Sequence, residues 1–143
     1  MGLSLIVLTI AIHTTAVVLM AFGLETRVRV DTHQPDRLRA MPAMIGHIGA
    51  VALILAALHG FEGVLWASAY WSLGALDSLT DASVYALATM TTFEIPGLTL
   101  PPRFQMLSAL EAMNGVLLFG ISTAFLFAVI QSHWQLLSHR HER

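Results

Sequence analysis

Three long runs without charged residues divide the chain. The first covers residues 1–24, the second covers residues 40–76 with one interruption at Glu62, and the third covers residues 112–139. A helix that crosses about 30 Å of hydrocarbon needs about 20 mostly apolar residues, so each run is long enough to span a bilayer. The pattern predicts an all-α integral membrane protein whose transmembrane helices cover residues 1–24, 43–76 and 105–137.

The segment between the second and third spans, residues 79–102, is too apolar for a simple loop and too short to cross a bilayer twice. Ser78 and Asp81 have the spacing of a capping box at a helix N-terminus. Pro96 removes a backbone donor and Gly97 permits unusual dihedral angles, so both favour the end of a helix. Non-helical backbone at membrane depth is tolerated only where protein buries it or where it lines a watery cavity. We therefore expect a re-entrant helix followed by a pore loop.

The composition agrees with a membrane protein and excludes several other classes. Hydrophobic residues make up 56% of the 143 residues and charged residues 11%, against about 25% charged residues in soluble domains. These values argue against a disordered chain and against an ordinary soluble enzyme. The 7 basic residues are outnumbered by 9 acidic ones, so no basic face is available for nucleic acid. The chain contains no cysteine, which excludes disulfides and thiolate metal sites.

The positions of the arginines predict how the chain lies in the membrane. Four arginines fall in residues 25–42 and two in residues 138–143, whereas the connection between the second and third spans holds only Arg103. Basic residues in short loops mark the cytoplasmic side. We therefore expect a cytoplasmic Arg-rich loop at 25–42, a cytoplasmic tail at 138–143 and an N-terminus outside the cell. Three aromatic residues near the end of the second span are predicted to form an interfacial belt: Trp66, Tyr70 and Trp71.

Two stretches in the second half of the chain carry a resemblance to a known family. Residues 85–98 read YALATMTTFEIPGL, and residues 110–125 read LEAMNGVLLFGISTAF. Together they resemble the bacterial two-transmembrane potassium-channel-type pore domains. The resemblance implies a homotetramer around a central conduction path, in the inner (plasma) membrane of a bacterium. It also implies a pore domain at residues 43–137, with an outer helix at 43–76, a pore helix and filter loop at 79–102 and an inner helix at 105–137.

The filter sequence departs from that family. Residues 91–93, Thr-Thr-Phe, match the approach to the family's filter, but residues 94–97, Glu-Ile-Pro-Gly, occupy the positions of its Gly-Tyr-Gly-Asp motif. A potassium filter strips water from the ion with rings of backbone carbonyls. The side chain of Glu94 and the fixed φ angle of Pro96 oppose the backbone conformation that aims those carbonyls. The sequence therefore predicts no normal potassium filter.

The residues Thr92, Phe93 and Glu94 instead resemble the Thr-x-Glu filter core of voltage-gated sodium and calcium channels. This resemblance implies a ring of four Glu94 carboxylates, which would attract cations, and divalent cations most strongly. We therefore expect a tetrameric cation channel with Glu94 as its metal-ion ligand. It would pass sodium, calcium or cations without selection, potassium included, and no other cofactor is expected. The expected ion filter comprises Thr91, Thr92, Phe93, Glu94 and Ile95.

Three polar residues within the spans are candidates to support the filter. Glu62 interrupts the second span and shares a helical face with His59. A contact to the pore helix or a neighbouring subunit, a proton or ion site, and a metal ligand are all open for Glu62. Glu111 begins the inner helix beside Asn114 and is expected to brace the pore loop by hydrogen bonds. His13 is expected to be a helix-packing or interfacial residue, because no histidine belongs to a recognisable metal-binding motif.

Two glycines and two hydroxyl residues occupy the third span. Gly115 and Gly120 permit either close helix packing or a gating hinge. Ser122 and Thr123 are candidates to face the conduction path. The expected partners of the whole chain are the lipid bilayer, further copies of the chain and cations, with no nucleic acid.

Three functions are compatible with these features. The leading one is passive cation permeation, which requires four Glu94 side chains at a common axis. The alternative is a non-conducting membrane scaffold or accessory subunit, with the axis closed by Phe93 or Ile95. A weaker third is an intramembrane enzyme or proton carrier, in which one cavity joins three buried residues: Glu62, Glu111 and His59.

Overall fold

Every element in the described part of the chain is a helix. The computed structural model describes the backbone of residues 1–30 and 37–138 and the side chains of residues 1–23 and 41–132. Its elements are α1 (Gly2–Val30), α2 (Arg37–Ser72), α3 (Leu79–Met90), the 3₁₀ turn η1 (Pro102–Phe104) and α4 (Gln105–Ser138). Three segments are long and apolar enough to cross a membrane: Gly2–Gly23, Met41–Ser72 and Pro102–Ser132. The predicted all-α chain with three membrane-spanning helices is confirmed to this extent.

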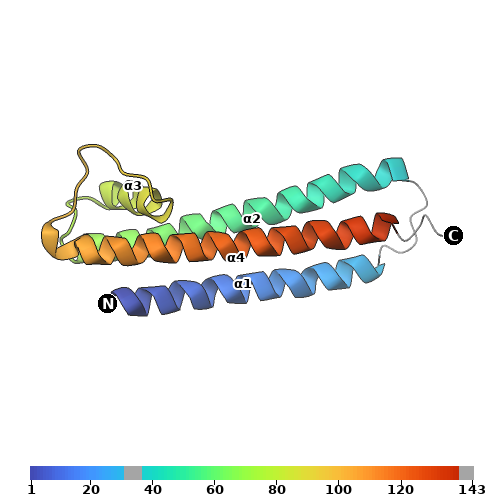
Figure 1. Cartoon of the computed structure of the whole chain (residues 1–143), viewed down its shortest axis with the longest axis horizontal. Coiled ribbons are helices and arrows are strands. Elements are labelled where there is room, and N and C mark those ends of the chain that lie inside the picture. Colours follow the sequence, from blue (N-terminus) through green and yellow to red (C-terminus); the bar gives the residue numbers. More distant parts are fainter. Residues whose placement is uncertain (31–36, 139–143) are drawn as a thin grey trace.

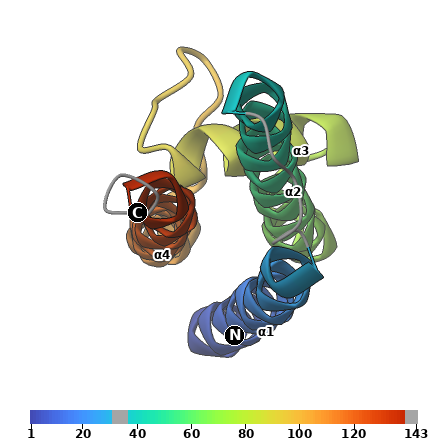
Figure 2. The ribbon, with the colours of Figure 1, turned by 90° about the vertical axis from the view of Figure 1, so that its right-hand side faces the viewer.

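The three long helices lie side by side, with α1 and α4 running in one direction and α2 in the other (Figure 1). The short helix α3 lies at the end of the bundle where α2 finishes and α4 begins. It packs against α2 and α4, and its backbone does not approach that of the described part of α1. Figure 2 shows α3 across these two helices, on the side away from α1. One end of the bundle therefore carries an extra layer of structure.

The helix ends differ from the predicted boundaries. α1 continues beyond residue 24 to Val30 and α2 begins at Arg37, so most of the segment 25–42, predicted to be a loop, is helical. Arginine and glutamate are good helix formers, which lets a helix continue past its apolar part. At its other end α2 stops at Ser72, short of residue 76. The reason is Gly74, which has a φ angle of 63° and ends the helix in a Schellman motif.

The start of α3 follows the predicted capping pattern. The backbone N–H of Asp81 donates to Ser78 Oγ over 3.0 Å, and this hydroxyl donates to Asp81 Oδ2 over 2.7 Å. Ala82 and Ala86 are fully buried, and their small side chains let α3 lie close to α2. A 12-residue helix is about 18 Å long, little more than half the hydrocarbon thickness of about 30 Å. The chain after α3 doubles back toward the end of the bundle (Figure 1).

The predicted aromatic belt is wrong for two of its three members. Trp66 and Tyr70 are fully buried and pack with alanines of α3 and with Leu100. Only Trp71, on another face of α2, is exposed, at 53%. Trp66 and Tyr70 are four residues apart and so share one helical face. That face is the one that meets the rest of the bundle.

The end of α3 touches α4 at Gly115. A Cβ atom on Gly115 would lie 2.3 Å from the carbonyl oxygen of Met90 and 2.7 Å from its Cα. No side chain fits there, so glycine lets the two backbones meet. A Cβ on Gly120 of the same helix would meet nothing within 4 Å. Of the two predicted hinge candidates, Gly115 therefore has a clear packing role within the protomer.

Alanine at the two glycines should separate a packing position from an open one. We expect Gly115→Ala to lower the free energy of unfolding by about 2–3 kcal/mol, because the added methyl group forces the α3 backbone to shift. Gly120→Ala should stay within about 1 kcal/mol of the wild type, since alanine has the higher helix propensity. Thermal unfolding of the purified protein in detergent measures both. Equal stability of the two variants would contradict the packing role.

Candidate functional site

The helix α3 ends in a backbone conformation that threonine rarely adopts. Thr92 has a φ angle of 58°. Its N–H donates to Thr89 O, and the N–H of Phe93 donates to Ala88 O, each over 2.9 Å. This is a Schellman motif with Thr92 at the position usually held by glycine, as Gly74 holds it at the end of α2. The left-handed conformation costs an L-residue about 1–2 kcal/mol, and strain of this kind collects at functional sites.

A second tight turn follows at residues 95–98. The N–H of Leu98 donates to Ile95 O over 3.2 Å, and Gly97 has a φ angle of 85°. Proline at the second position and a left-handed glycine at the third are the pattern of a type II turn. Beyond it the chain continues into η1 and the start of α4 (Figure 1).

The residues between the two turns face away from the rest of the protomer. Thr91 to Glu94 are all exposed, and Phe93 has 64% of its surface accessible. Among the residues whose side chains are described, Glu94 has no hydrogen-bond or ion-pair partner. A hollow of about 790 Å³ separates the loop from α3 and from the start of α4. Its walls on the helices include Tyr85, Thr89, Ser108 and Ala112. The loop is thus not buried by its own chain.

Glu111 is held by α2 and not by the loop. It is fully buried, and Tyr70 Oη donates a hydrogen bond of 2.6 Å to its Oε2 atom. The Tyr70 ring packs edge-on against Tyr85 of α3, with ring centroids 5.4 Å apart, and Tyr85 Oη lies 2.8 Å from Ser108 Oγ of α4. In the described part of the chain, the expected hydrogen bond from Glu111 to the filter loop is not formed. Any support for α3 from this side passes through the two tyrosines.

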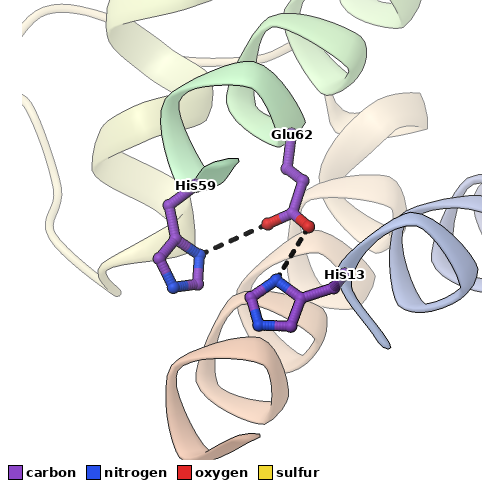
Figure 3. Close-up of side chains that lie close together, drawn as sticks. All are labelled: His13, His59 and Glu62. Carbon is purple, nitrogen blue, oxygen red and sulfur yellow. Dashed lines mark hydrogen bonds and ion pairs between the residues drawn. The ribbon is translucent and has the colours of Figure 1, made fainter. Parts of the chain in front are cut away.

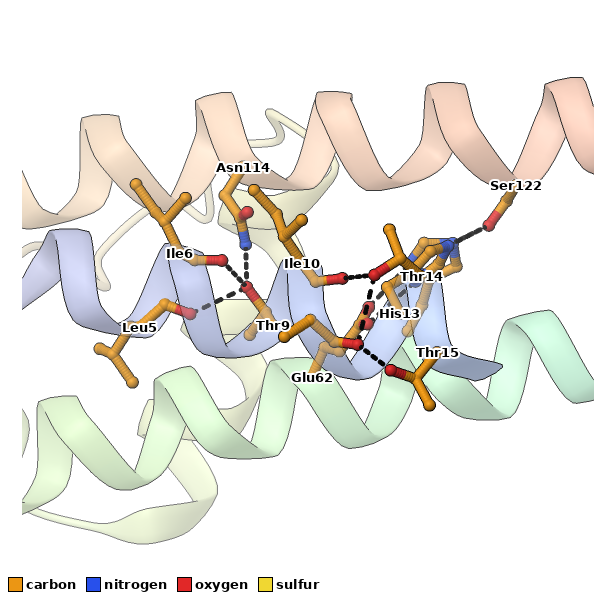
Figure 4. A network of polar contacts seen from close by, with 12 residues as sticks. Leu5, Ile6, Thr9, Ile10, His13, Thr14, Thr15, Glu62, Asn114 and Ser122 are labelled. Carbon is orange, nitrogen blue, oxygen red and sulfur yellow. Dashed lines mark hydrogen bonds and ion pairs between the residues drawn. The ribbon is translucent and has the colours of Figure 1, made fainter. Parts of the chain in front are cut away.

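Asn114 and Glu62, the other two expected filter supports, face α1. Asn114 Nδ2 donates to Thr9 Oγ1 over 2.8 Å, and Glu62 Oε1 lies 2.9 Å from His13 Nδ1 (Figure 4). Neither bonds to the loop among the residues described. Glu62 therefore finds its partner in the first span rather than in the short helix. The reason is that α1 packs on the inner faces of α2 and α4, whereas α3 lies on their other side.

Two histidines, a glutamate and a serine form one buried cluster between the three long helices. His13 Nδ1 lies 2.9 Å from Glu62 Oε1, and His59 Nδ1 lies 3.3 Å from Glu62 Oε2 (Figure 3). Ser122 Oγ of α4 is 3.0 Å from the Nε2 atom of each histidine. All four residues are at most 8% exposed. The His59 ring also stacks on Phe119, with ring centroids 4.1 Å apart.

The sequence interpretation did not bring this cluster together. His59 and Glu62 are neighbours on one helical face, as expected from their spacing. His13 was expected to be a packing or interfacial residue, and Ser122 to face a conduction path, yet both are buried against Glu62 and the histidines. Thr123, the other hydroxyl residue, is exposed and donates to the carbonyl of its own helix at residue 119. Only the four-residue spacing of the polar residues Thr9 and His13 hints that one face of α1 points inward.

Glu62 and Glu111 lie at different levels of the bundle. Tyr70, the partner of Glu111, follows Glu62 by eight residues, about 12 Å along α2. In the described residues, the single cavity required for the enzyme interpretation, joining Glu62, Glu111 and His59, is not seen. Five buried polar atoms along these levels lack a hydrogen-bond partner among the described groups: His59 Nδ1, Glu62 Oε2, Trp66 Nε1, Glu111 Oε1 and Asn114 Oδ1.

Comparison with protein-family models, with curated proteins and with solved structures finds no match to this chain. The resemblance to potassium-channel-type pores therefore remains a prediction from the residues of the two stretches.

Glycine at position 92 should relieve the strain at the end of α3. We expect Thr92→Gly to raise the free energy of unfolding by about 1 kcal/mol, because glycine adopts the left-handed conformation without a steric penalty. Thr91→Gly is the matched control: Thr91 has a φ angle of −91°, so glycine there should give no gain. Thermal unfolding in detergent measures both variants. A Thr92→Gly variant no more stable than the wild type would show that residue 92 carries no strain.

Proposed function

We propose that this protein is the subunit of a homotetrameric cation channel in a bacterial inner membrane. One observation carries the proposal. A helix of about half the membrane thickness, α3, is followed by a non-helical segment, residues 91–101, that doubles back toward the end of the bundle. This segment exposes the acidic side chain of Glu94, which has no partner in the described part of its own chain.

The backbone of the loop argues for assembly around a watery path. In hydrocarbon every backbone N–H and C=O group needs a hydrogen-bond partner, and irregular chain at membrane depth is stable only against protein or water. The protomer leaves a hollow behind the loop and leaves residues 91–94 exposed in front of it. Further copies of the chain would supply protein contacts to the loop, and a central aqueous path would supply hydrogen-bond partners for its exposed backbone groups.

The charge of the loop argues for cations as the permeating species. Four copies of Glu94 around an axis would repel one another at close range unless cations lay among them. Such a ring concentrates cations, and divalent cations most strongly. The neighbours Thr91, Thr92, Phe93 and Ile95 would form the remainder of the filter.

The same loop argues against selective potassium conduction. The chain leaves α3 through the Schellman motif at Thr92 and turns again at Pro96 and Gly97 within a few residues. Two turns so close together leave little extended backbone for stacked rings of carbonyl oxygens, which potassium selection requires. We therefore propose sodium, calcium or unselected cations as the permeant ions.

The arginines orient the proposed channel. The Arg-rich ends of α1 and α2 lie at the end of the bundle opposite α3 (Figure 1). Since basic connections mark the cytoplasmic side, the proposal puts this end in the cytoplasm and the loop on the outer side. The N-terminus of α1 would then lie outside.

A non-conducting scaffold is the second candidate, and Phe93 favours it. Phe93 is 64% exposed beside Glu94, and four phenylalanine rings at one axis would close the path. The protein would then keep the pore architecture as a membrane anchor or accessory subunit. Flux through the wild-type protein separates the two candidates.

Glutamine at position 94 tests the filter. In liposomes containing the purified wild-type protein, we expect cation flux. We expect Glu94→Gln to lower the calcium-to-sodium permeability ratio by about tenfold or more, because the ring loses four negative charges. Reversal potentials in planar bilayers measure this ratio. Asp77→Asn is the matched control, because Asp77 is exposed on the same side of the bundle but lies outside the loop.

The oligomeric state and the variant Phe93→Ala complete the test. Native mass spectrometry in detergent should show a tetramer. If the wild type is silent but Phe93→Ala conducts, the phenylalanine closes a real pore. If a tetramer forms and both proteins are silent, the scaffold function replaces the channel.

A further inference from the structure

We propose that His13, His59 and Glu62 form a binding site for a divalent transition-metal ion, with zinc as the best fit, inside each protomer. The site lies among α1, α2 and α4, away from the loop. It is independent of the proposed channel function, because it needs neither a tetramer nor conduction.

The spacing of the three side chains fits a small tetrahedral ion. Each offers one ligand atom, and these atoms lie within 4.8 Å of one another. The closest pairs are His13 Nδ1 to Glu62 Oε1 at 2.9 Å and His59 Nδ1 to Glu62 Oε2 at 3.3 Å. With bonds of about 2.0–2.2 Å at tetrahedral angles, neighbouring ligand atoms of zinc lie about 3.3–3.6 Å apart. Side-chain rotations that shorten the widest of these separations would bring all three atoms to this spacing.

Two of these atoms lack a hydrogen-bond partner, which points to a cation as the group that both would bind. His59 Nδ1 and Glu62 Oε2 are buried and have no hydrogen bond to any described group, although they lie only 3.3 Å apart. Buried polar groups are normally satisfied, so an unsatisfied pair needs an explanation. A metal ion between them would accept a lone pair from each atom. Two imidazoles and a carboxylate are a common ligand set of zinc, with a fourth position left for water.

The hydrogens available around Ser122 support the same conclusion. The cluster has three hydrogen bonds: His13 Nδ1 bonds to Glu62 Oε1, and Ser122 Oγ bonds to the Nε2 atom of each histidine. With Glu62 ionised and both histidines neutral, these three bonds use all three hydrogens of the rings and the hydroxyl, so the lone pair of His59 Nδ1 faces Glu62 Oε2 across 3.3 Å. A metal on the Nδ1 side changes this arrangement, because both rings then carry their hydrogen on Nε2. Ser122 Oγ has two lone pairs and can accept from both.

Ser122 would thus orient both metal-binding imidazoles. A histidine that binds a metal almost always donates its other ring N–H to a fixed acceptor, which sets the ring orientation. Here a single hydroxyl from α4, 3.0 Å from both Nε2 atoms, fills this role. His59 is 8% exposed and stacks on Phe119, which is 38% exposed, so the cluster lies close to the surface of the protomer.

The alternative is that an extra proton closes the cluster. One doubly protonated histidine would supply the fourth hydrogen and form a neutral pair with Glu62. The cluster would then be a clamp between helices without a metal. This alternative makes a different prediction for metal titration, so one experiment distinguishes the two.

The test is zinc binding by the full-length protein, purified without a histidine tag and stripped with a chelator. A His139→Asn/His141→Asn background removes the histidines of the C-terminal tail. We expect one zinc ion per protomer, with a Kd in the micromolar range or tighter and a rise in Tm. We also expect Co²⁺ to give the visible absorption of a tetrahedral site. His13→Asn, His59→Asn and Glu62→Gln should each weaken binding by more than about 100-fold, beyond the roughly 10- to 100-fold typical for a residue that only orients a ligand.

Two further variants sharpen the outcome. Ser122→Ala keeps all three ligands and should weaken zinc binding by about 10- to 100-fold. His47 lies on α2, as His59 and Glu62 do, but outside the cluster. His47→Asn should therefore leave the zinc affinity unchanged. If a ligand variant does not fold, the Co²⁺ spectrum and the zinc-dependent Tm of the wild type still decide. Absence of stoichiometric zinc in the wild type, or binding that survives Glu62→Gln, would overturn the proposal and leave the proton-closed clamp.

Discussion

The demand of buried polar groups for partners is the constraint on which the arrangement of the long helices depends. Lipid tails are as apolar as the faces of these helices, so the hydrophobic effect does not favour one helix packing over another. A polar side chain in the same surroundings is costly unless it meets a partner on a neighbouring helix. Thr9 and His13 supply this for α1, through Asn114 of α4 and Glu62 of α2. These contacts determine the rotation of α1 about its own axis and its position along the bundle relative to α2 and α4.

The constraint acts differently at the other side of the bundle, where α3 lies. There the contacts are close approaches of small residues: alanines of α3 against α2, and the Met90 backbone against Gly115 of α4. Buried polar contacts join α1 to α2 and α4, whereas α3 is joined to them mainly by steric fit, with a hydrogen bond between Tyr85 and Ser108. The loop begins directly after the close contact between Met90 and Gly115, so the position of its first residues is fixed by that contact.

Local sequence pattern determines some features of this fold and leaves others open. The three spans follow from the absence of charge over long runs, and Ser78 marks the start of α3, because both signals are local. The inward face of each span was not predictable. A helix that is apolar on all sides has no periodicity to show which face is buried. For this reason the sequence predicts an interfacial belt for Trp66 and Tyr70, which are buried, and does not group His13 with Glu62, which it contacts.

The hollow behind the loop has a consequence for how an opening of defined width could arise. In a protomer the loop is anchored by its two ends, at Met90 and at η1, while its middle stands apart from the helices. The fold of one chain therefore determines where the loop starts and finishes. It does not determine the distance between the middle of the loop and the helices. In the proposed assembly, neighbouring subunits would determine the bore. Selectivity would then be a property of quaternary structure, formed only when the last subunit closes the ring.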